Sequence, residues 1–213
     1  MPSTAPRRAL AACVIAAALT LPSVGWACSR VGVSGGDAVI SPERRIDQAK
    51  VDAAIRAEVN YHRCKAGLRP LAGAASLARV AQTHAKWMAK AQAVTHNSTV
   101  GGQSTVKARI VSTGIRLRAG SENIGMVHRY QIDGSSFRIT DSSACAFATH
   151  SGQPIPPHSY NSLARTMVGL WMRSSGHRRN ILDPKVAMVA TAAGFAPGAP
   201  YCGQFYLSQD FAG

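Results

Sequence analysis

Regularly spaced hydrophobic residues predict three long helices in this chain. The first begins at Ile46 and ends near Gly67, and its apolar residues recur every fourth position. The second follows Ser76, a residue type that caps helix N-termini. A shorter helix is expected over residues 106–113. The expected buried stripes of the long helices are Val51, Ile55 and Val59; Leu77, Val80, Ala81, His84 and Met88; and Leu163, Met167, Leu170 and Trp171.

Two apolar segments near the end of the chain predict an antiparallel hairpin. Residues 186–195 are apolar and partly β-branched, and residues 201–211 alternate in polarity, with the turn at Pro197-Gly198. Upstream, Asn123-Ile124-Gly125 is expected to end an exposed turn. Residues 126–160 are rich in Ser, Thr, Gly and Pro, so we expect a long loop there. Helices followed by antiparallel strands indicate the α+β class.

Residues 1–27 have the features of a secretory signal peptide. Two arginines precede an uncharged apolar run over residues 9–21, which is too short to span a membrane. Gly25-Trp26-Ala27 supplies small residues at the cleavage positions. Cys28 follows directly, so a lipoprotein signal is the alternative, although Gly25 and Trp26 match that signal poorly. We expect ordinary cleavage and export, to the periplasm or out of the cell.

The remaining chain, an N-terminal arm over residues 28–45 and a domain over residues 46–213, contains four cysteines. An even number of cysteines in an exported chain indicates two disulfides, and four cysteines allow three pairings. We favour Cys28–Cys64, which would join the arm to the first helix. The second bond would then be Cys145–Cys202, which would join the long loop to a late strand.

The chain is strongly basic. It has 24 Lys and Arg against 10 Asp and Glu, a formal net charge of +14, and it keeps +12 without the two arginines of the signal. This charge favours anionic partners such as lipids or envelope polymers. Specific nucleic-acid binding is not expected, because the sequence has no recognition motif and no dense run of basic residues. The alternative is that the charge serves only solubility. We expect a monomer.

Short motifs follow one another in a fixed order between residues 48 and 212. They are Asn60 with Gly67-Leu68-Arg69-Pro70-Leu71, Ala81-Gln82-Thr83-His84-Ala85, His96, Glu122-Asn123-Ile124, Val168-Gly169-Leu170-Trp171-Met172, Gly176-His177-Arg178-Arg179-Asn180-Ile181-Leu182 and Tyr206-Leu207-Ser208-Gln209-Asp210-Phe211. Each motif alone is weak, but their order and spacing are specific. The chain resembles the CAP superfamily of cysteine-rich secretory, antigen-five and pathogenesis-related proteins, also called the SCP domain, and in particular its exported bacterial branch. The resemblance implies an α-β-α sandwich with a central antiparallel sheet.

The resemblance also implies a cleft that contains histidines and carboxylates. By motif, His96 and His177 match the two histidines of the family and Glu122 matches its first glutamate. Ser174 stands where eukaryotic members have a second glutamate, which argues against a mechanism that needs two carboxylates. We expect Gly176 to turn the backbone sharply at a helix end, with His177 just beyond it. Gln209 is expected to border the cleft.

Two functions are compatible with such a cleft, and the sequence leaves open whether the protein is an enzyme. The first, which we favour, is a binding module for a small lipid, sterol-like or envelope ligand, because the family includes lipid and sterol binders and because a family indicates fold better than reaction. The second is a zinc-dependent hydrolase acting on peptide or envelope polymer. Zinc is the one cofactor that the residues suggest, with His96 and His177 as its ligands.

Glu122 would then serve as the base for a metal-bound water, or as the hydrogen-bond partner that fixes one imidazole. His150 or His158 would supply a third ligand if the long loop covered the cleft. Both cleft histidines also have a structural alternative, in which they only bind backbone groups or organise a helix end. A third function, contact with another protein through residues 126–160, also stays open.

Overall fold

The computed structural model describes Met1 and residues 28–213, so the predicted signal peptide and its cleavage site lie outside the described residues. The helices are α1 (Gln48–Lys65), α2 (Ala75–Ala91), α3 (Val106–Val111), α4 (Tyr160–Arg173) and α5 (Ser175–Ile181). The strands are β1 (Ala72–Gly73), β2 (Gly120–His128), β3 (Arg138–Asp141), β4 (Ala146–Ala148), β5 (Met188–Ala196) and β6 (Gln204–Ala212). None of the described helices is long and apolar enough to cross a membrane.

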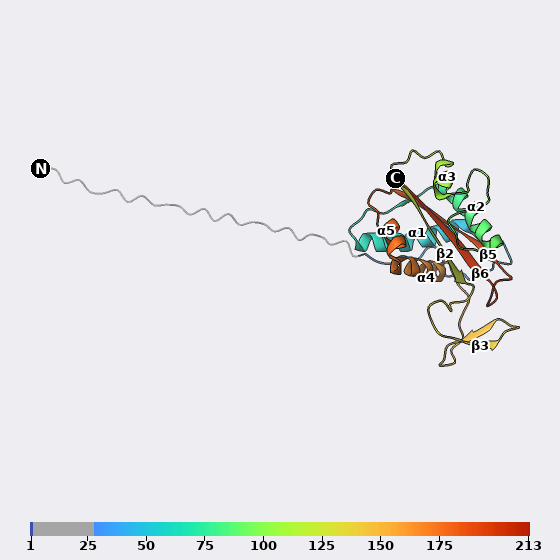
Figure 1. Ribbon diagram of the computed structural model, residues 1–213. Coiled ribbons are helices and arrows are strands. Elements are labelled where there is room, and N and C mark those ends of the chain that lie inside the picture. Colours follow the sequence, from blue (N-terminus) through green and yellow to red (C-terminus); the bar gives the residue numbers. More distant parts are fainter. Residues whose placement is uncertain (2–27) are drawn as a thin grey trace.

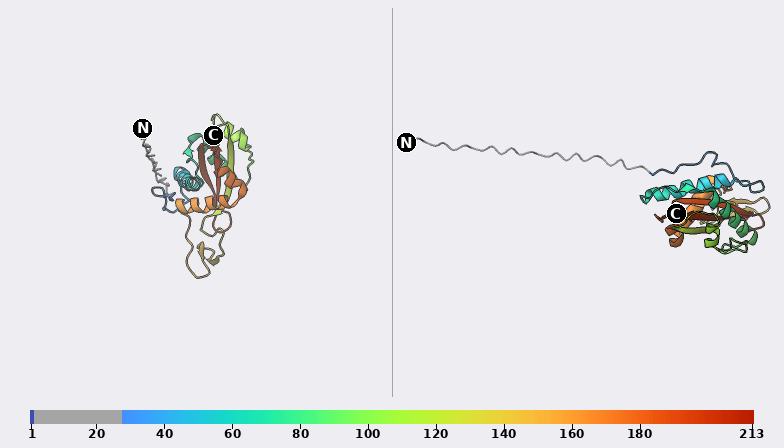
Figure 2. Two further views of the ribbon diagram at one scale, coloured as in Figure 1. Left: turned by 90° about the vertical axis from the view of Figure 1, so that its left-hand side faces the viewer. Right: turned by 90° about the horizontal axis from the view of Figure 1, so that it is seen from above.

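The central sheet has the strand order β1-β5-β6-β2 and lies between two helical layers (Figures 1 and 2). β5, β6 and β2 are antiparallel, and the short strand β1 pairs in parallel with β5. α1 and α4 pack on one face, and α2 covers the other. The α+β class and the α-β-α sandwich are therefore confirmed.

Alternation along β6 divides the core between the two faces of the sheet. Phe205, Leu207 and Phe211 are buried in the cluster that contains α1 and α4, whereas Tyr206 packs with Met88 of α2. Successive residues of a strand point to opposite faces, so the intervening polar residues of β6 project toward α2. Ser208 and Asp210 are therefore buried between the sheet and α2.

The predicted long helices and the C-terminal hairpin are present. Asp47 caps α1 by accepting a hydrogen bond from the Lys50 main chain, and Ser159 caps α4 in a reciprocal pair with Ser162. The prediction that Ser76 caps the second helix was wrong. α2 begins at Ala75, and Ala74 at its N-cap makes no side-chain capping bond.

Residues 120–128 correct a second prediction, because they form a largely buried strand and not an exposed turn. Gly125 allows the close approach of α4: a Cβ at this position would collide with the side chain of Met167. Next to it, the Trp171 indole nitrogen donates to the main-chain oxygen of Ile124 over 2.9 Å. The motif Glu122-Asn123-Ile124 therefore lies within a strand of the sheet, and α4 packs directly against this strand.

Both predicted disulfides are confirmed. The Cα atoms of Cys28 and Cys64 are 5.8 Å apart, and those of Cys145 and Cys202 are 6.0 Å apart. The second bond attaches residues 126–160 to the β5–β6 turn. This segment is less irregular than the sequence indicated, because it contains the β3–β4 hairpin, which projects from the sandwich (Figure 1).

Candidate functional site

A buried carboxylate lies at the centre of the candidate site. The side chain of Glu122, on β2, has no exposed surface. Arg109 of α3 binds it with two groups: its Nε donates to Oε2 over 3.0 Å and its Nη2 to Oε1 over 2.8 Å. His96, on the loop after α2, places its Nδ1 2.7 Å from Oε1. A guanidinium, a carboxylate and an imidazole are thus linked from the interior of the domain to its surface.

Arg109 also holds the loop that carries the imidazole. Its side chain is fully buried, and it donates to the main-chain oxygens of His96 over 2.6 Å and of Gln103 over 2.9 Å. Three partners therefore use the donors of one guanidinium, which is the pattern expected for an arginine without contact to water. Sequence reasoning missed this residue, because it lies in a short helix where no motif marks a buried cation.

The imidazole of His96 is half-exposed and has a defined tautomer. Its side chain is 48% exposed. A carboxylate can only accept a hydrogen bond, so the bond to Glu122 requires the proton to lie on Nδ1 when the ring is neutral. Nε2 then keeps its lone pair for a proton, a metal ion or a hydrogen-bond donor. Carboxylates that orient metal-ligating histidines bind the ring in the same way, through the nitrogen that does not face the metal.

His177 lies within α5 and not beyond a helix end, which corrects the sequence prediction. Gly176 is likewise inside this helix, and its backbone is not in the left-handed region. Burial lowers the pKa of His177, and the nearby charge of His96 lowers it further. The helix that carries His177 also contacts β2 at the partner of His96, because Asn180 of α5 donates to the main-chain oxygen of Glu122.

Amide side chains connect α5 to the sheet behind these histidines. Asn123 donates to the main-chain oxygen of His177 over 3.3 Å and to Oε1 of Gln209 over 3.1 Å. Asn180 donates to the main-chain oxygen of Glu122 over 3.2 Å. Gln209 itself has no exposed surface. The sequence had suggested that Gln209 borders an open cleft. Because it is fully buried, it instead supports the wall of the site.

Two further side chains complete the surroundings of the carboxylate. Ser208 donates to Oε2 of Glu122 over 3.2 Å. His84 of α2 lies 4.0 Å from the same oxygen, and its Nε2 is 2.9 Å from the main-chain oxygen of Thr95. Burial alone would raise the pKa of Glu122, but the bond from His96 and the charge of Arg109 outweigh it and hold the pKa below its usual value.

Comparisons with known proteins decide the family. The CAP family, described as the cysteine-rich secretory protein family, matches residues 56–211. The chain belongs to this family. A search of curated protein sequences gives no match.

Two solved structures share the fold of this CAP domain. One is an extracellular protein containing an SCP domain from Bacillus anthracis, with 19% identity over 81% of this chain and a TM-score of 0.51. The match covers 44% of that protein, so this chain spans less than half of its length. The other is an outer surface protein from Borrelia burgdorferi, with 13% identity, a TM-score of 0.52 and coverage of 79% of this chain and 97% of that one.

Other predicted residues of this CAP domain lie apart from the pair of imidazoles or make no bond to it. Ser174 is partly buried at the junction of α4 and α5, and no hydrogen bond among the described residues joins it to His177. His158 is fully buried, with its Nδ1 2.9 Å from the hydroxyl of Ser162. His150 is exposed in the turn after β4. The structure therefore gives no support to either histidine as a third ligand in the cleft.

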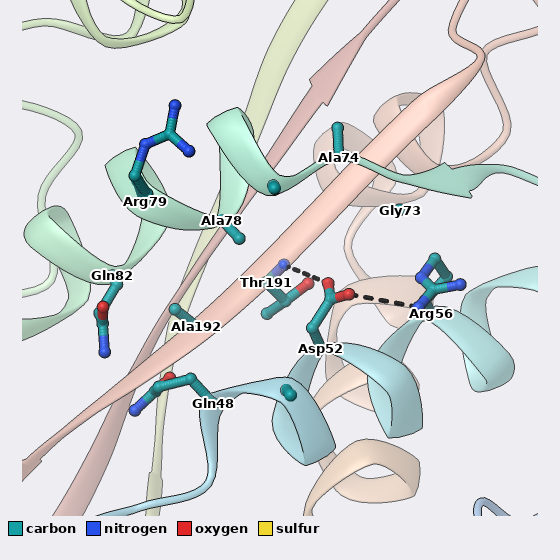
Figure 3. Close-up of a pocket in the computed structure, with 12 residues that line it drawn as sticks. Gln48, Asp52, Arg56, Gly73, Ala74, Ala78, Arg79, Gln82, Thr191 and Ala192 are labelled. Atoms are coloured by element: carbon teal, nitrogen blue, oxygen red, sulfur yellow. Dashed lines mark hydrogen bonds and ion pairs between the residues drawn. The ribbon is translucent and has the colours of Figure 1, made fainter.

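A groove of about 420 Å³ opens at the opposite edge of the CAP sheet, between α1 and α2 (Figure 3). Its floor is rich in alanine. Asp52 accepts a hydrogen bond from the main-chain nitrogen of Thr191 over 2.9 Å, and Gln48 exchanges two hydrogen bonds with the main chain of Ala193. These side chains of α1 cover the edge of β5 beyond the end of β1, where unpaired backbone groups would otherwise invite another strand.

Proposed function

We propose that this chain is an exported CAP domain that binds an anionic ligand, a lipid head group or an envelope polymer, at the surface formed by His96 and His177. The burial of Glu122 is the observation that carries this proposal. Its oxygens accept from Arg109, His96 and Ser208, and its side chain has no exposed surface. A carboxylate held in this way orients an imidazole but does not reach a substrate or its water.

The residues that follow His177 in the chain favour an anion. Arg178 and Arg179 follow it in α5, and both are exposed. They line a groove of about 430 Å³ together with Asn180, Leu182, Asp183 and Pro184. Exposed arginines bind phosphate and carboxylate groups with paired hydrogen bonds. The formal net charge of +14 adds long-range attraction for the same class of partner.

Co-sedimentation with lipid vesicles tests this function. The purified protein should bind vesicles that contain phosphatidylglycerol and should not bind vesicles of phosphatidylcholine alone. A His96→Ala/His177→Ala variant should bind phosphatidylglycerol at least about tenfold more weakly, a loss of about 1.4 kcal/mol. His150→Ala, which removes an exposed histidine outside the cleft, is the matched control. Equal binding by all three proteins would exclude the cleft as the binding surface.

A zinc-dependent hydrolase is the second candidate, and the bond between His96 and Glu122 favours it. Carboxylates bound in this way to a zinc-ligating histidine fix its tautomer. The two imidazoles fit part of a zinc site, but the buried Glu122 offers no third ligand, and no group of three or more such side chains gathers among the described residues. Water would have to complete the coordination.

Calorimetric titration with Zn²⁺ tests the metal site. Wild-type protein should bind one ion, and the His96→Ala/His177→Ala variant should bind none. Identical isotherms would remove zinc from the site. Because Glu122 orients His96 in this arrangement, Glu122→Gln should weaken zinc binding about tenfold or more, as for other partners of ligating histidines.

A further inference from the structure

The carboxyl group of Asp210 lies beside the hydrogen-bond network of Glu122. Asp210 is on β6, directly across from Glu122 in the register of the β2–β6 pair. Its other neighbour in the sheet is Ala190 of β5. Paired residues on neighbouring strands project to the same face, so the two carboxyl groups share the layer beneath α2. The side chain of Asp210 has no exposed surface.

The carboxyl oxygens of Asp210 are buried without a hydrogen-bond donor among the described residues. The charged and titratable groups around it are Glu122 from β2, Arg109 from α3 and His84 from α2, which lies beside Glu122. Arg109 directs its hydrogen bonds to Glu122 and to loop carbonyls, and His84 bonds to Thr95. A second buried negative charge here would have neither water nor a donor.

We propose that Asp210 holds a proton in the folded protein and donates it to the carboxylate of Glu122, so that Asp210 is a positioning residue for Glu122 and, through it, for His96. The proton belongs on Asp210 because Glu122 already accepts from a guanidinium, an imidazole and the hydroxyl of Ser208. Such acceptance stabilises the ionised form of Glu122.

The electrostatics of the pair agree with this geometry. Burial raises the pKa of Asp210 well above its usual value, the charge of Glu122 raises it further, and Arg109 acts in the opposite direction. Two carboxyl groups that are close together do not both ionise, and the one with fewer donors keeps the proton. The proton on Asp210 is independent of any ligand. Only the final step, from the orientation of His96 to binding, rests on the proposed function.

Carbon NMR of the wild-type protein tests the protonation directly. With assignment through the backbone, the carboxyl carbon of Asp210 should have the shift of a protonated acid at pH 6. Asp141, which is exposed and whose pKa is lowered by its bonds to Ser143, should show the shift of a carboxylate. An ionised shift for Asp210 at pH 6 would overturn the proposal.

The pH dependence of stability gives a second test through Asp210→Asn, which keeps a donor toward Glu122 but cannot ionise. A raised folded pKa makes the wild type lose stability as pH rises above the unfolded value. The Tm of Asp210→Asn relative to wild type should therefore increase between pH 4 and pH 7, by about 3 °C or more. Ser208→Ala removes a neutral donor to Glu122 from the same strand and should lower Tm by a constant amount between pH 5 and pH 7, where Glu122 stays ionised.

A relative Tm of Asp210→Asn that falls as pH rises would show an ionised Asp210 and overturn the proposal. If Asp210→Asn does not fold, the NMR experiment on the wild type still decides. The positioning role has its own readout, the nitrogen resonance of the His96 Nδ1–H group. It should be preserved in Asp210→Asn and shifted in Asp210→Ala; an unshifted resonance in Asp210→Ala would remove the positioning role. None of these measurements uses vesicles, so failure of anionic-lipid binding would count against the proposed function alone.

Discussion

Two carboxylate–arginine pairs lie toward opposite edges of the sheet, and they differ chiefly in their access to water. Glu122 and Arg109 are both 0% exposed, and their charged atoms approach to 2.8 Å. Asp52 and Arg56, in the groove of Figure 3, are 16% and 33% exposed and approach to 3.4 Å. The buried pair is enclosed by further donors, whereas the groove pair has one backbone donor and solvent beside it.

The pKa values of the two carboxyl groups shift in opposite directions. Burial acts to raise the pKa of both. At Glu122 the bond from His96 and the charge of Arg109 outweigh burial, and the pKa falls. At Asp52 the Thr191 main chain and the charge of Arg56 do not outweigh it, and the pKa rises. A carboxylate therefore stays ionised when it is buried with several donors, as Glu122 is, and this lets it hold the imidazole of His96. Asp52 has fewer donors and holds no histidine.

Removing the arginine of each pair should give the largest difference between the two regions. Arg109→Met leaves a buried carboxylate without its counter-ion and should cost about 3–5 kcal/mol of unfolding free energy. Arg56→Met breaks a partly exposed pair and should cost about 0.2–1 kcal/mol. Urea unfolding at pH 7 measures both. Equal losses would mean that enclosure does not distinguish the two pairs.

Neutralising Glu122 should have a smaller effect, with a defined pH dependence. Because the folded state lowers the pKa of Glu122, the ionised side chain contributes stability above its unfolded pKa of about 4.3. This stability is lost as pH falls through the folded pKa. Glu122→Gln should therefore cost about 3 kcal/mol at pH 7, because it leaves Arg109 buried without a counter-ion although the amide oxygen still accepts a hydrogen bond, and less below pH 4. Glu43→Gln, at an exposed ion pair with Arg129, is the control and should change little at either pH. A cost that stays constant down to pH 3 would contradict the lowered pKa.

Much of the scaffold of the candidate site was predictable from hydrophobic spacing, but its interior was not. Apolar repeats predicted α1, α2, α4 and the β5–β6 hairpin, because these elements bury one apolar face each. β2 was missed because Glu122 and Asn123 interrupt its apolar pattern with two buried polar residues. The order of the motifs identified the two histidines and Glu122. It does not show which of these side chains already have all their hydrogen-bond partners within the protein.

Arg109 and Asp210 show why the rest of the site could not be predicted. A lone arginine in a short helix is typical of a solvated residue, and only the tertiary contact with Glu122 explains its burial. A signal for Asp210 did exist. Alternation along β6 placed Phe205, Leu207 and Phe211 on one side, which left Asp210 on the other side of the same strand. Its pairing with Glu122 depends on strand register, which the sequence pattern did not provide.

A small effect with a defined sign is expected from Asp52→Asn in the groove. Because the folded state raises the pKa of Asp52, the stability that Asp52 contributes is fully present below its unfolded pKa of about 3.9. This stability is lost as pH rises through the folded pKa. Asn keeps an acceptor for the main chain of Thr191 but carries no charge to bury. Relative to wild type, Asp52→Asn should therefore gain Tm as pH rises from 4 to 8, by about 2–4 °C for about 1 kcal/mol. Glu122→Gln should change in the opposite direction over the lower part of this range. If both variants followed the same pH trend, the environments of the two carboxyl groups would not differ as their donors indicate.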